Sequence, residues 1–220
     1  MPPTNRSSSY PLCLFVGALL IIVAAALHPH LSGGGVDELN AIGRSSGWQA
    51  VHWAFLAGFV LSLTGLGGIV HSYNGTTGEE AMRAGVIVMT FAYGAWMVVV
   101  TFMLGAGWKL AQNYVLPEAG MTSAHAVFVY DMVRPFALAA QRTAAFALGV
   151  ATYQLGRGLL RASVEQRWLG WGGIASGLVA AALAILFGEA TKADQVAFAP
   201  PVLWQLVLAG VLMARRPIAP

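Results

Sequence analysis

Arg142 is the residue with the clearest capacity for chemistry, because it lies inside a long apolar run. The run from Phe136 to Leu155 contains no acidic residue that could neutralise the positive charge of Arg142. A charged group near the centre of a bilayer is costly and is read first as a functional site. Three interpretations stay open. The guanidinium could donate to carbonyls or hydroxyls of facing helices, it could snorkel to the interface, or it could bind an anionic lipid headgroup, isoprenoid phosphate or cofactor carboxylate with its planar fork.

Asp131, Arg142 and Tyr153 are spaced by eleven residues, so on a helix of about 3.6 residues per turn they share one stripe. Along the axis Asp131 lies about 16 Å from Arg142, which is too far for an ion pair. Arg134, three residues after Asp131, is the better partner for that carboxylate on the same helix. The predicted ligand-binding residues are therefore Asp131, Arg134, Arg142 and Tyr153.

Histidines form a second group of candidate ligands. His28 and His30 end the first apolar run, His52 begins the second, and His125 precedes the fourth. All four are expected on the outer side of the membrane, and imidazole binds zinc, copper and haem iron. The hairpin between the first two runs would bring His28 and His52 into contact with or without a metal. No cofactor is assigned, but haem and copper stay open beside a structural role.

Six apolar stretches must position these side chains. A transmembrane helix needs about 20 apolar residues, and the stretches lack the alternating pattern of barrel strands. We predict an all-α polytopic transmembrane bundle that forms a single domain over residues 1–220. The expected spans are residues 11–28, 48–70, 84–107, 133–156, 168–188 and 201–214.

The composition agrees with a membrane protein and argues against nucleic-acid binding. The chain is 57% hydrophobic and only 10% charged, whereas soluble domains average about a quarter charged residues. Its 12 Lys and Arg residues are scattered between the apolar runs and form no basic block. The single cysteine, Cys13, excludes an intramolecular disulfide and a Cys-based metal site.

Loop charges predict the orientation. One side of the membrane would hold Arg6, Arg83, Arg157, Arg161, Arg167, Arg215 and Arg216, and the other would hold Arg44, Lys109 and Lys192. Seven basic residues against three place both termini in the cytoplasm by the positive-inside rule. A rival interpretation treats the first run as a secretory signal cleaved near Ala24-Ala25-Ala26.

The loops carry further local signals. Val36–Ile42 should form a short interfacial helix, and Thr122 or Ser123 should cap the fourth long helix. Tryptophans near the span ends are expected to act as interface anchors. These are Trp48, Trp53, Trp108, Trp168, Trp171 and Trp204.

Two stretches resemble a broad set of small bacterial membrane proteins of unknown function. One is Leu27-His28-Pro29 followed by Gly47-Trp48-Gln49-Ala50-Val51-His52, and the other is Leu155-Gly156-Arg157-Gly158-Leu159-Leu160-Arg161 followed by Trp168-Leu169-Gly170-Trp171-Gly172-Gly173. The second lacks the proline that often precedes its Trp-Leu-Gly run. The resemblance implies a compact helical bundle in a bacterial inner membrane and carries over no catalytic residue.

The leading hypothesis is a non-enzymatic membrane protein, either ligand-binding or an accessory subunit. Its outer-side pocket would be lined by His28, His52, Asp131 and Arg142. One alternative is an intramembrane enzyme acting on a lipid or isoprenoid, in which Asp131 or a histidine moves protons. Another is a haem or copper protein. The expected partners are the lipid bilayer, a small-molecule or lipid ligand, and another membrane protein.

Overall fold

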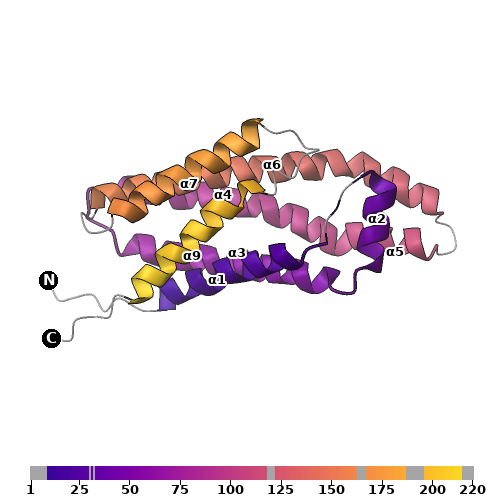
Figure 1. Cartoon of the computed structure of the whole chain (residues 1–220), viewed down its shortest axis with the longest axis horizontal. Coiled ribbons are helices and arrows are strands. Elements are labelled where there is room, and N and C mark those ends of the chain that lie inside the picture. Colours follow the sequence, from indigo (N-terminus) through magenta and orange to yellow (C-terminus); the bar gives the residue numbers. More distant parts are fainter. Residues whose placement is uncertain are drawn as a thin grey trace.

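The protein is built from helices, and the residues that the structure describes contain no strand (Figure 1). The computed structural model describes residues 9–29, 31, 33–117, 122–162, 167–186 and 196–214. The helices are α1 (Ser9–Leu27), α2 (Gly35–Arg44), α3 (Trp48–His71), α4 (Glu79–Phe102), the π-helix η1 (Met103–Gly107), α5 (Trp108–Val115), α6 (Ser123–Ala162), α7 (Arg167–Leu186) and α9 (Ala199–Ala214). The predicted all-α class is confirmed.

Four helical stretches are long and apolar enough to cross a membrane. They are α1, α3, α7 and the continuous run Glu79–Val115 that joins α4, η1 and α5. The apolar helix α9 is shorter, with 16 residues. The predicted span 133–156 lies inside α6, which has 40 residues and continues through Pro135. Two helical stretches are therefore much longer than the apolar runs from which they were predicted.

The helices form two layers (Figure 1). One layer contains α1 packed on α3, and the other contains α6 packed between α4 and α7. The layers are joined where α3 contacts α4 and where α9 crosses from α1 to α7. The short helices α2 and α5 pack together at one end of the bundle, which we call the outer end.

Glycine allows the closest approaches within each layer. A Cβ atom on Gly58 of α3 would lie 2.9 Å from the carbonyl oxygen of Gly17 in α1. A Cβ on Gly177 of α7 would lie 2.5 Å from the carbonyl oxygen of Gly149 in α6. Backbones can pack this closely only without side chains, and such small-residue contacts are typical of helices that associate in lipid. Gly149 of α6 thus packs directly against α7.

An aromatic seam fills the space between the two layers. Phe59 of α3 stacks on Tyr93 of α4 with 5.0 Å between ring centroids. Trp96 of α4 stacks on Phe198, just before α9, at 3.4 Å. The Tyr93 hydroxyl donates a hydrogen bond of 3.0 Å to the side-chain oxygen of Gln205 in α9. The seam therefore ties α9 to both α3 and α4.

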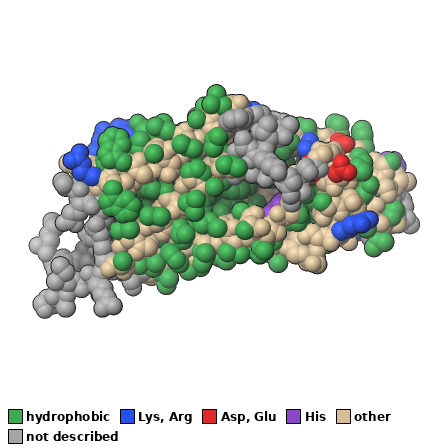
Figure 2. All heavy atoms as spheres, viewed as in Figure 1, with side chains coloured by type: hydrophobic (Ala, Val, Ile, Leu, Met, Phe, Trp, Pro, Cys, Tyr) green, Lys and Arg blue, Asp and Glu red, His purple; other side chains and the backbone are tan. Residues whose placement is uncertain are grey.

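The outer end has its own small core. Leu39 and Ile42 of α2 are fully buried and pack in one cluster with Trp48 and Tyr130. The short helix expected over Val36–Ile42 is confirmed as α2, which begins one residue earlier and ends two later. Figure 2 shows most charged side chains of this face toward the two ends of the long axis, with hydrophobic side chains along the middle.

The start of α6 agrees with the capping prediction. The backbone N–H of His125 donates a hydrogen bond of 3.3 Å to the Thr122 hydroxyl oxygen. Thr122, rather than Ser123, is therefore the N-cap, because an N-cap side chain accepts from the backbone two or three residues later. Buried Ala126 and Tyr130 then hold the first turns of α6 against the outer-end cluster.

Candidate functional site

His28 and His52 form a contact pair near the outer end. His28 directly follows α1, and His52 lies in the second turn of α3. Their ring centroids are 5.2 Å apart and the ring planes are tilted by 54°. His52 is 3% exposed, and His28 is half-buried. The contact expected from the hairpin is confirmed.

Backbone carbonyls determine which nitrogen of each ring carries the proton. The Nδ1 atom of His28 lies 2.8 Å from the Pro29 carbonyl oxygen. The Nδ1 atom of His52 lies 2.8 Å from the Trp48 carbonyl oxygen. A carbonyl oxygen only accepts hydrogen bonds, so each Nδ1 bears the hydrogen and each Nε2 keeps a lone pair. Metal-binding histidines are commonly oriented in this way.

Trp48 completes the pair, and we call Trp48, His28 and His52 the ring cluster. The indole centroid lies 5.1 Å from that of His28 and 4.2 Å from that of His52. Its Nε1 donates a hydrogen bond of 3.0 Å to the Met103 carbonyl oxygen in η1. π-Helical segments occur frequently at functional sites. The expectation that Trp48 anchors the interface is wrong, because the side chain is fully buried.

The guanidinium of Arg142 is bound to the end of α7. Its Nε donates to the Ala184 carbonyl oxygen at 2.6 Å, and its Nη2 donates to the Ile185 carbonyl oxygen at 2.8 Å. These carbonyls lie in the last described turn of α7. A cation there also complements the negative end of the helix dipole. These contacts agree with the first interpretation of Arg142, in which its guanidinium donates to carbonyls of a facing helix.

Arg134 is paired across helices instead of with Asp131. Its Nη2 lies 2.7 Å from Oε1 of Glu38, and its Nε donates to Oε2 at 2.9 Å. The Tyr130 hydroxyl donates to the same Oε2 at 2.8 Å. The predicted Asp131–Arg134 pair is therefore wrong, because α2 brings a buried carboxylate that matches both arms of the guanidinium. Burial and the adjacent Glu38 carboxylate raise the pKa of the Tyr130 hydroxyl.

The other predicted site residues lie apart from the ring cluster. Asp131 is exposed, and its carboxylate lies against the backbone of Gly35. The ring of Tyr153 carries the Arg157 guanidinium 5.7 Å from its centroid. His125 is exposed in the first turn of α6, and His30 lies outside the described residues. The four predicted ligand-binding residues are thus distributed along α6 and have different neighbours.

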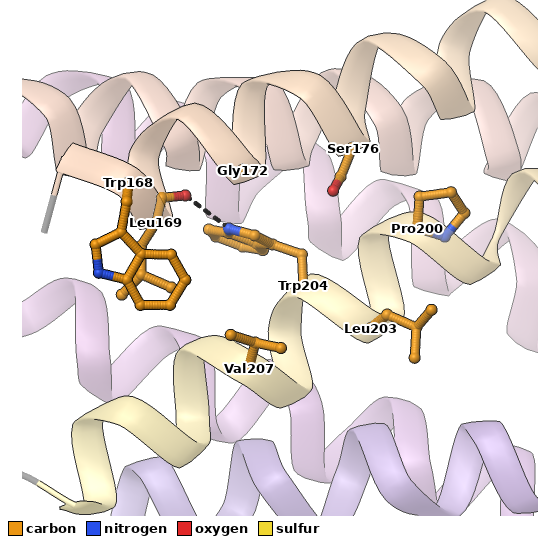
Figure 3. Close-up of a pocket in the computed structure, with 8 residues that line it drawn as sticks. All are labelled: Trp168, Leu169, Gly172, Ser176, Pro200, Leu203, Trp204 and Val207. Carbon is orange, nitrogen blue, oxygen red and sulfur yellow. Dashed lines mark hydrogen bonds between the residues drawn. The ribbon is translucent and has the colours of Figure 1, made fainter.

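A groove of about 330 Å³ lies between α7 and α9 (Figure 3). It is lined by Trp168, Leu169, Gly172, Ser176, Pro200, Leu203, Trp204 and Val207. Trp204 points from α9 to α7, where its Nε1 donates a hydrogen bond of 2.8 Å to the Leu169 carbonyl oxygen. The sequence predicted only interface anchoring for Trp168 and Trp204, and for Trp204 this is wrong, because the side chain is 5% exposed. The groove depends on how α9 crosses α7, which local sequence signals do not encode.

No known protein family, curated protein or solved structure matches the chain. Function must therefore be inferred from the chemistry of the side chains. The Glu38 carboxylate and the Arg142 guanidinium are already bound to neighbouring groups. The ring cluster differs, because each of its two imidazoles has one nitrogen, Nε2, that the Nδ1 contacts to backbone carbonyls leave unprotonated.

Proposed function

We propose that the protein is a non-enzymatic, polytopic membrane protein that binds a metal ion at the ring cluster. The observation that carries the proposal is the His28–His52 pair. Two imidazoles, one directly after α1 and one in α3, lie with their centroids 5.2 Å apart. Both present the same tautomer, with Nδ1 held by the backbone and Nε2 unprotonated. Such pre-oriented rings lose little freedom when an ion binds.

The geometry favours a single ion over haem. Metal–imidazole bonds are about 2.0–2.1 Å long, so two rings that share one ion have centroids roughly 5–6 Å apart. The observed separation of 5.2 Å falls in this range. A porphyrin between the rings would have to displace the indole of Trp48, which contacts both. Copper is the first metal to test, because it heads the affinity order for nitrogen ligands.

Helix lengths suggest where the bilayer lies. The described parts of α1 and α7, with 19 and 20 residues, are about 28–30 Å long, which matches about 30 Å of hydrocarbon. With 40 residues, α6 is about 60 Å long and exceeds that thickness twofold. A bilayer matched to α1 and α7 leaves α2 and α5 outside. It also places Arg142, half-way along α6, at the outer boundary instead of the centre.

In this arrangement α1, α3, α4, α6, α7 and α9 form six spans of a bacterial inner-membrane protein. The basic residues of the inner loops place both termini in the cytoplasm. A fluorescent protein fused after the last residue should fluoresce, and alkaline phosphatase fused there should be inactive. The reverse result would overturn this orientation. The metal site would remain, but on the other side of the membrane.

Metal binding can be tested with the purified full-length protein in detergent. After chelation, the protein is titrated with Cu(II) and Zn(II), desalted and analysed for bound metal. We expect about one copper ion per chain. His28→Asn and His52→Asn should each abolish retention, because asparagine can keep the donor at the Nδ1 position but lacks the Nε2 ligand.

His125→Asn is the matched control, since this histidine is exposed on α6 away from the pair. It should retain copper as the unmodified protein does. Thermal unfolding of each metal-free variant shows whether lost retention reflects a lost fold. Equal copper retention by both pair variants and the control would overturn the proposal, as would failure of the unmodified protein to retain either metal.

A further inference from the structure

The groove between α7 and α9 is open to the surface and has a distinctive lining. Trp168, Leu203 and Val207 line it and are 57%, 51% and 45% exposed. In Figure 3 the Ser176 hydroxyl points into the space between the two helices, and Pro200 lies beside it on α9. At Gly172 an added Cβ would still be 3.5 Å from the Trp204 ring. The groove is therefore apolar, shallow and free of backbone obstruction at this point.

The length of the groove matches one leaflet of a bilayer. On α7 it runs from Trp168 to Ser176, which is about 12 Å at 1.5 Å per residue. Half of a hydrocarbon layer of about 30 Å is about 15 Å. Because Trp168 is the second residue of α7, the groove begins at the end of the helix and descends toward its middle. An acyl chain that enters at this end would lie along it.

Positive charge lies at the end where the chain would enter. Arg167 precedes Trp168 and is exposed at the first position of α7. Arg161 is in the last turn of α6, to which α7 is packed. Figure 2 shows Lys and Arg side chains gathered near this end of the molecule. Basic residues between helices at the cytoplasmic face are a common way to bind anionic headgroups.

We propose that this groove binds one acyl chain of an anionic phospholipid, with the phosphate at Arg167. Trp168 would lie at headgroup level, where its amphipathic ring is favoured. The apolar lining would hold the chain, and the guanidinium would select the negative headgroup. The site lies at the opposite end of the bundle from the ring cluster. It goes beyond the proposed metal binding and does not depend on it.

Lipid exchange on the full-length protein tests the proposal. The protein in detergent is offered equal amounts of phosphatidylglycerol and phosphatidylethanolamine with identical chains, and bound lipid is measured by native mass spectrometry. We expect at least a fivefold preference for phosphatidylglycerol. Arg167→Gln should remove the preference, and Ser176→Leu should reduce binding of both lipids by filling the groove. Leu203→Phe fills it from α9 and provides a second test should Ser176→Leu fail to fold.

Two control variants separate this site from general lipid contact. Arg83→Gln removes an equal charge, but one that is paired with Glu79 at 2.6 Å on α4. Leu178→Phe adds bulk at an exposed position of α7 outside the groove. Both should bind lipid as the unmodified protein does. The proposal fails if the unmodified protein does not discriminate between the lipids, or if the controls change binding as much as the groove variants do.

Discussion

The outer end of this protein and the half that holds its long apolar helices are held together by different means. At the outer end, α2 is fastened to α6 by the ion pair between Glu38 and Arg134. This is the one ion pair between different helices among the residues that the structure describes. In the other half, α6 and α7 meet through bare backbone at Gly149 and Gly177. The outer end is therefore held by a directed polar contact, and the other half by the close approach of two helix backbones.

In the proposed membrane arrangement, the difference follows from the two solvents, lipid and water. In lipid, burial of apolar side chains drives association weakly, because the surroundings are equally apolar. Helices there gain most from dense packing, which glycine permits. Outside the hydrocarbon, water restores the hydrophobic effect, so the cluster around Leu39 and Ile42 can form. A buried ion pair then orients α2 over that cluster.

The first prediction concerns the packing of α7 on α6. Gly177→Ala should destabilise the protein by about 3 kcal/mol, the upper end for overpacking, because the new Cβ meets backbone atoms. Gly94→Ala, at a position with nothing within 4 Å, should be neutral or stabilising by up to about 1 kcal/mol. Unfolding in detergent measures both. Equal stability of the two variants would contradict the packing scheme.

The second prediction concerns the ion pair of the outer end. Glu38→Gln should lower the free energy of unfolding by about 2–3 kcal/mol. This is below the usual range for a buried ion pair, because the Arg134 side chain is 30% exposed. Hydrogen exchange should increase in α2 and leave α7 unchanged. Asp37→Asn, one residue away and exposed, is the control. Loss of protection in α7 would show that the two regions are not independent.

The third prediction addresses Arg142, which lies where the two regions meet. Arg142→Leu should lower the free energy of unfolding by about 2 kcal/mol, because the Ala184 and Ile185 carbonyls lose the hydrogen bonds that the guanidinium donates. Arg142→Lys should recover part of this loss, because lysine retains the charge and one donor. Thermal unfolding provides the measurement. An unchanged midpoint in Arg142→Leu would refute the structural role.

The smallest effect is expected at alkaline pH. The pKa of Tyr130 is raised in the folded protein, so folding favours the protonated hydroxyl. Its contribution is fully present below the unfolded pKa of about 10 and is lost as the pH rises above that value. Tyr130→Phe should lower stability at neutral pH and weaken the decline of stability above about pH 10. Parallel curves for the two proteins would contradict the assignment.

Most helices of the fold could be predicted from apolar runs, yet their lengths could not. The runs mark the segments that suit lipid, whereas α6 continues for ten residues before the predicted span begins at residue 133. Those turns are retained because Thr122 caps them and Tyr130 is buried against α2. The N-cap could be predicted from the sequence. The burial required knowledge of where α2 folds.

The candidate site was likewise predicted only where local sequence or chain connectivity determines the contacts. His28 and His52 lie at the two ends of the connection between α1 and α3, which contains α2, so chain connectivity was sufficient. Trp48 was missed, although its spacing of four residues from His52 places both on one face of α3. The partner of Arg134 was assigned to the same helix because only local pairs can be read along a sequence. Glu38 is 96 residues away and reaches it through tertiary structure.

The unbroken course of α6 has a mechanical consequence. It continues through Pro135 from the outer end into the other half, and near its midpoint Arg142 holds it to α7. A tilt of roughly ten degrees about that point would swing the far tip by about 5 Å. The ion pair with Glu38 would pull α2 along, and α2 packs on Trp48 beside the two imidazoles. A force that tilts α6 would therefore reach the ring cluster as a displacement.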